Sequence, residues 1–192
     1  MEHFYNGIKG WFDFQSTYTR MVNEHGDGAR FVEVGTYLGC SLAYLAVEIA
    51  NSGKKIQLDA VDTWLGSPDE PYQQMQEEVK NGTLYDDFLR NIEPIKDYVN
   101  IIRNESVEAA KLYENESLDF VFIDASHHYE YVKADLDAWY PKIKKGGYIG
   151  GHDYVPPSVG PGGIYGVYEA VNELFPNDFQ VVDNVSWIHQ KT

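Results

Sequence analysis

A carboxylate and two imidazoles follow directly after the most apolar short segment of the sequence. Residues 118–124 consist mainly of Leu, Phe, Val and Ile before they end in Asp124, which is typical of a buried parallel strand. His127 and His128 come next. Ligands of parallel sheets bind beyond the carboxyl ends of the strands, and imidazole suits proton transfer near neutral pH. We therefore expect His127 to act as a general base on a ligand held beside Asp124, with His128 as the second candidate base.

A second histidine and aspartate end the next expected strand. This strand is predicted over residues 148–154, where glycines and apolar residues lead into His152 and Asp153. A histidine at a strand end is more often a structural hydrogen-bonding group than a catalytic one. We interpret His152 in that structural sense.

A glycine loop near the start of the chain joins an expected strand to an expected helix. The short apolar segment 31–34 breaks at Gly35, and apolar residues at helical spacing follow over 42–49. Strand, glycine turn and helix N-terminus form the ligand-binding corner of a doubly wound α/β domain. The first N–H groups of a helix lack intrahelical partners, so this corner favours an anionic or hydrogen-bond-accepting group.

The loop lacks the glycines that a phosphate ligand requires. In the dinucleotide fingerprint G-x-G-x-x-G, counted from Gly35, the second and third glycine positions are Tyr37 and Cys40. The triphosphate-binding pattern G-x-x-x-x-G-K-[ST] occurs nowhere in the chain. Glu33, at the end of the strand, would repel phosphates but suits the ammonium group of an amino acid.

An acidic residue also ends the second expected strand. Asp62 closes the segment 56–62 and follows Gly39 by 23 residues, close to the spacing at which a carboxylate meets ribose hydroxyls. A carboxylate accepts two hydrogen bonds from a vicinal diol, so we expect Asp62 to bind a ribose. Thr63 comes next, and Trp64 would either flank an adenosine or pack in the core.

These features resemble the class I S-adenosylmethionine-dependent methyltransferases. The loop from Glu33 to Gly39 has the pattern E-x-G-x-x-x-G, which is similar to their motif I, where the methionine end of the cofactor binds. Residues after the third strand, expected over 98–103, line the adenine pocket in that family, although Ser106 would equally serve as a helix N-cap. The resemblance implies a cofactor site formed by Glu33, Gly35, Thr36, Tyr37, Gly39, Ser41, Asp62, Thr63, Trp64, Glu105, Ser106 and Asp124.

The second half of the chain resembles small-molecule O-methyltransferases related to enzymes of macrolide-sugar and cephalosporin pathways. It carries D-x-x-H-x-Y from Asp124, D-L-x-x-W from Asp135, then K-x-G-G and a strand that ends H-D-Y. The resemblance spans roughly residues 29–175. It implies transfer of a methyl group from S-adenosylmethionine to an oxygen of a small-molecule acceptor, such as a sugar or another hydroxyl compound.

The same resemblance implies a metal ion. In related metal-dependent enzymes, the acids after the fourth and fifth strands hold Mg²⁺, which orients a substrate hydroxyl, and these acids correspond to Asp124 and Asp153. Oxygen ligands suit Mg²⁺. The chain departs from the pattern at His152, where sugar enzymes often have an acid, and at Tyr154, where catechol-type enzymes supply an amide. The alternative is that Asp124 only orients the substrate or His127.

Two other functions remain open. The chain could be a catalytically silent protein that keeps a nucleoside or S-adenosylmethionine site, or an NAD-dependent oxidoreductase, although the glycine pattern for NAD is absent.

The composition of the chain limits which ligands and partners it can bind. The chain has 192 residues and a net charge of −15, which opposes binding to nucleic acid or to anionic membranes. Cys40 is the only cysteine, so an intrachain disulfide and a cysteine zinc site are excluded. We find no apolar stretch of membrane-spanning length and no signal-peptide pattern, so we expect a cytoplasmic protein.

The elements predict one α/β domain over residues 1–192. We expect a doubly wound, Rossmann-like, three-layer α/β/α fold with a seven-stranded, mostly parallel sheet and a C-terminal antiparallel hairpin. Residues 1–28 are expected to form a helical cover over a sheet face or over the cofactor mouth. Residues 66–98 form a helical insert that is longer than a crossover requires, and it is a candidate substrate lid or homodimer contact.

Overall fold

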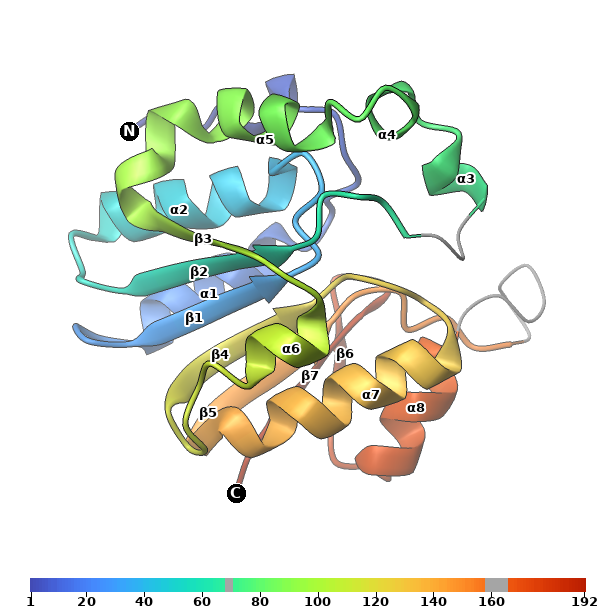
Figure 1. Ribbon diagram of the computed structural model, residues 1–192. Helices are drawn as coiled ribbons and strands as arrows, with labels where there is room; N and C mark the ends of the chain where they lie inside the picture. Colours follow the sequence, from blue (N-terminus) through green and yellow to red (C-terminus); the bar gives the residue numbers. More distant parts are fainter. Residues whose placement is uncertain (68–70, 158–165) are drawn as a thin grey trace.

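A seven-stranded sheet organises the chain (Figure 1). The computed structural model describes residues 1–67, 71–157 and 166–192. The strands lie in the order β3-β2-β1-β4-β5-β7-β6. In chain order they are β1 (Arg30–Val34), β2 (Gln57–Asp62), β3 (Val99–Arg103), β4 (Leu118–Ile123), β5 (Ile143–Gly151), β6 (Gln180–Val182) and β7 (Ser186–Gln190).

The sheet is parallel except at its C-terminal end. Strands β1 to β5 pair in parallel, and β7 pairs antiparallel with both β5 and β6. The order reverses beside β1, because β2 and β3 extend to one side of it and β4 and β5 to the other. A crevice at such a reversal is where α/β sheets bind ligands. The predicted fold class and C-terminal hairpin are therefore confirmed.

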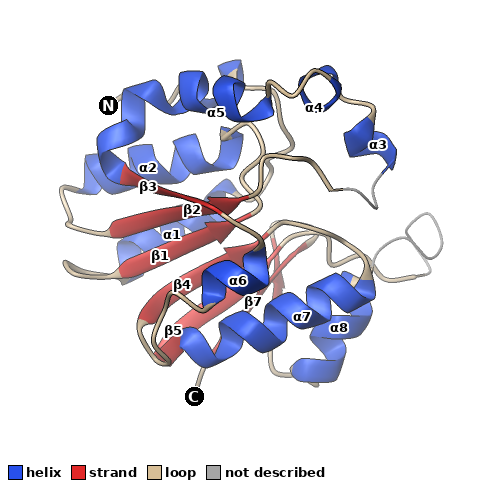
Figure 2. Cartoon of the chain, viewed as in Figure 1, coloured by secondary structure: helices blue, strands red, loops and turns tan. Residues whose placement is uncertain are grey.

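Helices cover both faces of the sheet (Figure 2). One apolar layer packs α1 (Gln15–Glu24), α2 (Cys40–Ser52) and α5 (Leu84–Ile92) against the sheet. The opposite layer holds α6 (Ser106–Ala110), α7 (Tyr129–Trp139) and α8 (Val167–Leu174). No helix within the described ranges is both long and apolar enough to cross a membrane.

The two segments outside the basic α/β repeat lie on the α1–α2 side. Residues 1–28 contain the short helix η1 (Tyr5–Gly7) and α1, whose Tyr18 and Met21 are completely buried. Residues 66–98 contain α3 (Pro71–Gln74), α4 (Glu77–Lys80), α5 and η2 (Glu93–Tyr98), while positions 68–70 lie outside the described residues. Helices α3 and α4 lie out past the carboxyl ends of β1 and β2 (Figure 1).

Two local predictions were wrong. Strand β5 begins at Ile143 and not at Tyr148, because Pro141 stops the helical run and the K-x-G-G segment continues directly into the sheet beside β4. Ser106 is the first residue of α6 and caps nothing; Glu105 occupies the N-cap position, without a side-chain cap. The Ser106 hydroxyl instead accepts a hydrogen bond from Trp139 Nε1 at 2.9 Å.

Gly35 follows β1 directly and lies against the backbone that follows β4. It has φ +86°, and a Cβ atom built on it would lie 2.0 Å from the carbonyl oxygen of Asp124 and 2.8 Å from Cα of Ala125. Both neighbours are backbone, so the contact cannot relax by a side-chain rotation. Only glycine satisfies the dihedral angle and the space together.

We expect Gly35→Ala to lower the free energy of unfolding by roughly 3 kcal/mol, from a strained dihedral plus overpacking against backbone. Gly53→Ala is the matched control, since Gly53 has φ +69° with nothing within 4 Å of a Cβ atom. That variant should lose only about 1 kcal/mol. Urea denaturation followed by circular dichroism measures both, and equal losses would show that the β1–β4 contact is unimportant.

The layer between β1 and the helices α1 and α2 contains an acid. Glu33 is only 1% exposed, and its carboxyl group accepts hydrogen bonds from Ser41 Oγ at 2.7 Å and from Tyr18 Oη at 2.8 Å. Burial raises the pKa of Glu33 to about 8, although these two hydrogen bonds act in the opposite direction. The protonated form is therefore favoured by folding.

This raised pKa predicts a pH dependence of stability. A carboxyl group that titrates at a higher pH in the folded state contributes stability below its unfolded pKa, and that contribution is lost as the pH rises through about 8. We expect Glu33→Gln to flatten the decline in unfolding free energy between about pH 4.5 and 8. Denaturation of both proteins across this range tests it, and parallel curves would contradict a buried, protonated Glu33.

Candidate active site

A cavity of about 340 Å³ opens at the carboxyl ends of β1, β2 and β4, a size usual for small-ligand sites. Its floor and walls come from the segments that follow β1 to β4, together with parts of the insert and of α7. The lining residues are Val34, Gly35, Tyr37, Val61, Asp62, Thr63, Gly66, Ser67, Gln73, Leu84, Asn104, Glu105, Ser106, Val107, Asp124, Ala125, Ser126, Tyr131 and Asp135.

The charged side chains among the described residues that line this cavity are all acidic. Four acids, Asp62, Glu105, Asp124 and Asp135, lie along it, and no Lys, Arg or His is among the described residues that line it. Carboxylates in a partly enclosed site attract cations and hydrogen-bond donors and repel phosphates. The cavity therefore suits a sulfonium amino acid attached to a nucleoside and opposes a dinucleotide diphosphate.

Asp62 organises the loop after β1. Its Oδ2 accepts hydrogen bonds from the backbone N–H groups of Thr36 at 2.8 Å and Tyr37 at 2.9 Å, and its Oδ1 accepts one from Trp64 N–H at 2.8 Å. Burial raises the pKa of Asp62 to about 6, and these backbone donors oppose the rise. The amides of Thr36 and Tyr37 thus bind a side chain of the protein itself.

The chain adopts left-handed backbone angles at three strand ends around the cavity. Tyr37, Trp64 and Asp153 have φ of 48°, 51° and 57° and follow β1, β2 and β5. Such angles cost about 1 kcal/mol or more in residues with a side chain, and they gather at ligand sites. The loops after these strands are therefore held in fixed, strained shapes.

The predicted cofactor residues divide into two groups. Gly35, Tyr37, Asp62, Thr63, Glu105, Ser106 and Asp124 line the cavity, whereas Glu33, Thr36, Gly39, Ser41 and Trp64 do not. The Glu33 carboxyl faces Tyr18 and Ser41 on the other side of β1. Trp64 is buried, with its ring 4.5 Å from that of Phe88, so it packs in the core.

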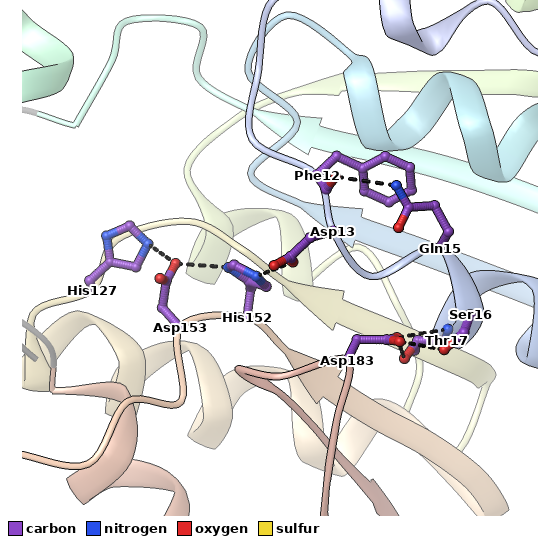
Figure 3. A network of polar contacts seen from close by, with 9 residues as sticks. All are labelled: Phe12, Asp13, Gln15, Ser16, Thr17, His127, His152, Asp153 and Asp183. Atoms are coloured by element: carbon purple, nitrogen blue, oxygen red, sulfur yellow. Dashed lines mark hydrogen bonds and ion pairs between the residues drawn. The ribbon is translucent and has the colours of Figure 1, made fainter. Parts of the chain in front are cut away.

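A row of imidazoles and carboxylates lies beside the cavity (Figure 3). His127 Nε2 is 2.9 Å from Asp153 Oδ2, and the same oxygen is 3.1 Å from His152 Nδ1. His152 Nε2 is in turn 2.9 Å from Oδ1 of Asp13, which comes from the segment before α1. The structure thus brings His127 and Asp153 together, a pairing that the sequence analysis did not predict, and adds His152 and Asp13 as partners.

Electrostatics in this row are tightly coupled. Burial alone would lower the pKa of His152, but the hydrogen bond to Asp153 and the charge of Asp124 outweigh it and raise the pKa to about 9. The pKa of Asp153 falls below its usual range, because hydrogen bonds from His127 and His152 outweigh its burial. Asp153 is therefore an ionised carboxylate between two imidazoles.

Asp124, His152 and Asp153 form a group that could hold a metal ion. One ligand atom from each lies within 4.8 Å of the others. Asp124 and Asp153 are the predicted ligands, and His152 adds a nitrogen donor. This donor set fits a divalent cation. It mixes imidazole and carboxylate ligands, however, whereas Mg²⁺ prefers oxygen ligands alone.

His128 has a different place from its neighbour. It occupies the N-cap position of α7, and its backbone N–H points to Ser126 Oγ at 3.5 Å. His127, by contrast, contacts Asp153 and lines a second, small pocket together with Asp124 and His152. This geometry favours His127 over His128 as the base.

Sequence patterns missed two acids of this region. Asp13 gives no local signal, because its contact with His152 depends on how residues 1–28 fold back over the sheet. Asp135 does give one: it shares the apolar face of α7 with Val132, Leu136 and Trp139, all of them buried. A charged residue in such a stripe indicates a buried polar group.

Known proteins share this sequence pattern and fold. A family model described as a methyltransferase domain matches residues 32–154. The uncharacterized protein y4gI of Sinorhizobium fredii (strain NBRC 101917 / NGR234) is 30% identical over 124 residues, which cover 65% of this chain and 13% of that protein. The chain therefore spans about one eighth of the length of this relative.

Solved structures agree with the fold. The O-methyltransferase NovP superposes with a TM-score of 0.68 at 18% identity, over 93% of this chain and 79% of NovP. The calicheamicin methyltransferase CalS11 gives a TM-score of 0.63 at 15% identity, over 92% of this chain and 76% of CalS11. An apo structure describes CalS11 as a TDP-rhamnose 3'-O-methyltransferase.

The matched region begins in β1 and ends just after β5, so it includes the loop after β1, Asp62, Asp124 and the His127–Asp153 pair. It covers well over half of the 192 residues. As the sequence analysis expected, the chain belongs to the methyltransferase domain family.

Proposed function

We propose that the chain transfers the methyl group of S-adenosylmethionine to a hydroxyl oxygen of a small acceptor, such as a sugar. The observation that carries this proposal is the His127–Asp153 pair, 2.9 Å apart, next to the acid-lined cavity. A hydroxyl must lose its proton to become a good nucleophile, and an imidazole oriented by a carboxylate is suited to accept it. The names of NovP and CalS11, which include oxygen methylation, support the choice of oxygen.

The cavity acids explain how the cofactor would bind. Asp62 holds the loop through backbone amides and keeps lone pairs that can accept hydrogen bonds from ribose hydroxyls. Asp124, at the end of β4, lies between the cavity and the His127 row, so it would face the positively charged end of the cofactor. The lack of a basic side chain among the described lining residues argues against NAD.

Methyl transfer then needs alignment and removal of a proton. The sulfonium carries a methyl group that is already activated for in-line displacement. As the acceptor oxygen forms its bond to that carbon, the carbon–sulfur bond breaks and His127 takes the hydroxyl proton, leaving a neutral thioether. Asp153 stabilises the imidazolium that results, because it is ionised and in contact.

We further propose that Asp124, His152 and Asp153 hold a divalent cation. Such an ion would lower the pKa of a bound acceptor hydroxyl and fix its position. The mixed donor set favours a first-row transition metal over Mg²⁺, because transition metals accept imidazole nitrogen whereas Mg²⁺ prefers oxygen ligands.

Substitution of the base tests the assignment directly. His127→Gln should reduce kcat by about 10²–10⁴-fold, the usual contribution of a general base, and leave S-adenosylhomocysteine affinity unchanged. Turnover is measured as S-adenosylhomocysteine formed with a panel of sugars and phenols.

His128→Gln is the matched control and should keep most of the activity, because His128 lies at the α7 N-cap. Greater loss in this variant would move the catalytic role to His128. A wild-type protein that binds S-adenosylmethionine but turns over no acceptor would instead be a silent binding protein.

The metal proposal has its own test. Treatment with a chelator should lower turnover by about tenfold or more, and Mn²⁺ should restore it better than Mg²⁺. Electron paramagnetic resonance counts bound Mn²⁺ without any acceptor, and His152→Ala should weaken that binding.

Asp137→Asn is the control, since Asp137 is exposed on α7 and pairs with Lys133. Full turnover in the presence of the chelator, together with no bound Mn²⁺, would leave the His127–Asp153 pair to work alone.

A further inference from the structure

A buried acid in the cavity has no part in the steps above. Asp135 is 5% exposed, lies on the apolar face of α7 and lines the cavity together with Ser106. Its carboxyl group accepts a hydrogen bond from the Ser106 hydroxyl, and the Ser106 oxygen accepts one from Trp139 Nε1. This chain of bonds fixes the carboxyl group at the end of the cavity formed by α6 and α7. A carboxylate can accept about four hydrogen bonds, so acceptor capacity remains for a ligand.

The direction of the cofactor follows from where the reaction must occur. The methyl group has to face the acceptor, so the sulfonium end of the cofactor lies toward Asp124 and the His127 row, after β4 and β5. Asp62, the expected ribose ligand, ends β2, and the backbone oxygen of Asp62 accepts a hydrogen bond from Asn104 N–H at 3.0 Å. The cavity continues from there along residues 104–107 to Asp135. The nucleobase must therefore occupy that far end.

We infer that Asp135 recognises the exocyclic amine of the adenine ring and so selects adenosine-containing cofactors; this inference rests on the proposed function. A carboxylate held by Ser106 accepts a hydrogen bond from an amine, whereas it repels the carbonyl oxygen that replaces that amine in hypoxanthine. A buried acceptor that loses its donor is left unsatisfied, which makes such sites strongly selective.

The test uses two ligands that differ only at the exocyclic amine of the purine ring. They are S-adenosylhomocysteine and S-inosylhomocysteine, with affinities measured by isothermal titration calorimetry. The wild-type protein should bind the adenine form at least about tenfold more tightly. In Asp135→Asn the preference should fall toward one, mainly through weaker binding of S-adenosylhomocysteine, because the charge is lost and the amide can also donate to the hypoxanthine oxygen.

Asp137→Asn, two residues along the same helix but exposed and paired with Lys133, should keep the wild-type preference. Equal affinity of the wild-type protein for both ligands would overturn the inference, and this comparison needs no variant that might misfold. A variant of Asp135 that weakens both ligands equally would overturn it too, because that pattern belongs to a merely structural residue. If wild-type protein bound neither ligand, the proposed function itself would fail.

Discussion

The close contact of two backbones at Gly35 sets the geometry of the whole site. A Cβ atom there would lie 2.0 Å from the Asp124 carbonyl, so the loop after β1 and the start of the loop after β4 are in direct contact. The first loop carries the amides that Asp62 holds, and the second carries Asp124 and His127. The proposed cofactor and acceptor groups lie next to each other because these two strands are adjacent. One glycine therefore lets two loops meet that the sequence keeps about 90 residues apart.

Several acidic side chains are buried in and near the cavity. Burial raises the pKa values of Glu33, Asp62 and Asp135, to about 8, 6 and 6. Each ionised carboxylate is unfavourable while its surroundings hold few compensating charges. A ligand that brings a sulfonium, an ammonium group and several hydrogen-bond donors would relieve part of that penalty in the cavity. Cofactor binding should accordingly couple to the stability of the fold, as ligand linkage requires.

Sequence patterns predicted the sheet and the strand-end residues well, because buried parallel strands are continuous apolar runs and ligand residues follow them directly. This reasoning singled out Asp62 and Asp124, which line the cavity, and His127, which contacts Asp153. Glu33 follows the same logic, yet strand alternation turns its side chain toward Tyr18, and no local rule identifies that partner. Asp13 reaches His152 only because the segment before α1 folds back over the sheet. The two residues are 139 positions apart in the sequence. Ser106 lines the cavity, but the alternative interpretation of it as an N-cap was wrong, because its hydroxyl bonds Trp139 on another helix.

His152 contacts a carboxylate through each of its two ring nitrogens. Its nitrogens face Asp13 and Asp153, and its pKa of about 9 means that both nitrogens carry protons in this form. An imidazole that binds a metal must release one proton, and the carboxylate on its other nitrogen then fixes the ring. Asp13 already occupies that second position. The proton on Nδ1 and the divalent cation proposed above would compete for one place beside Asp124 and Asp153, and the same Asp153 oxygen contacts His127. His152 therefore affects the local charge as well as the donor set, because it contributes a neutral or cationic ring where a third carboxylate would add a negative charge.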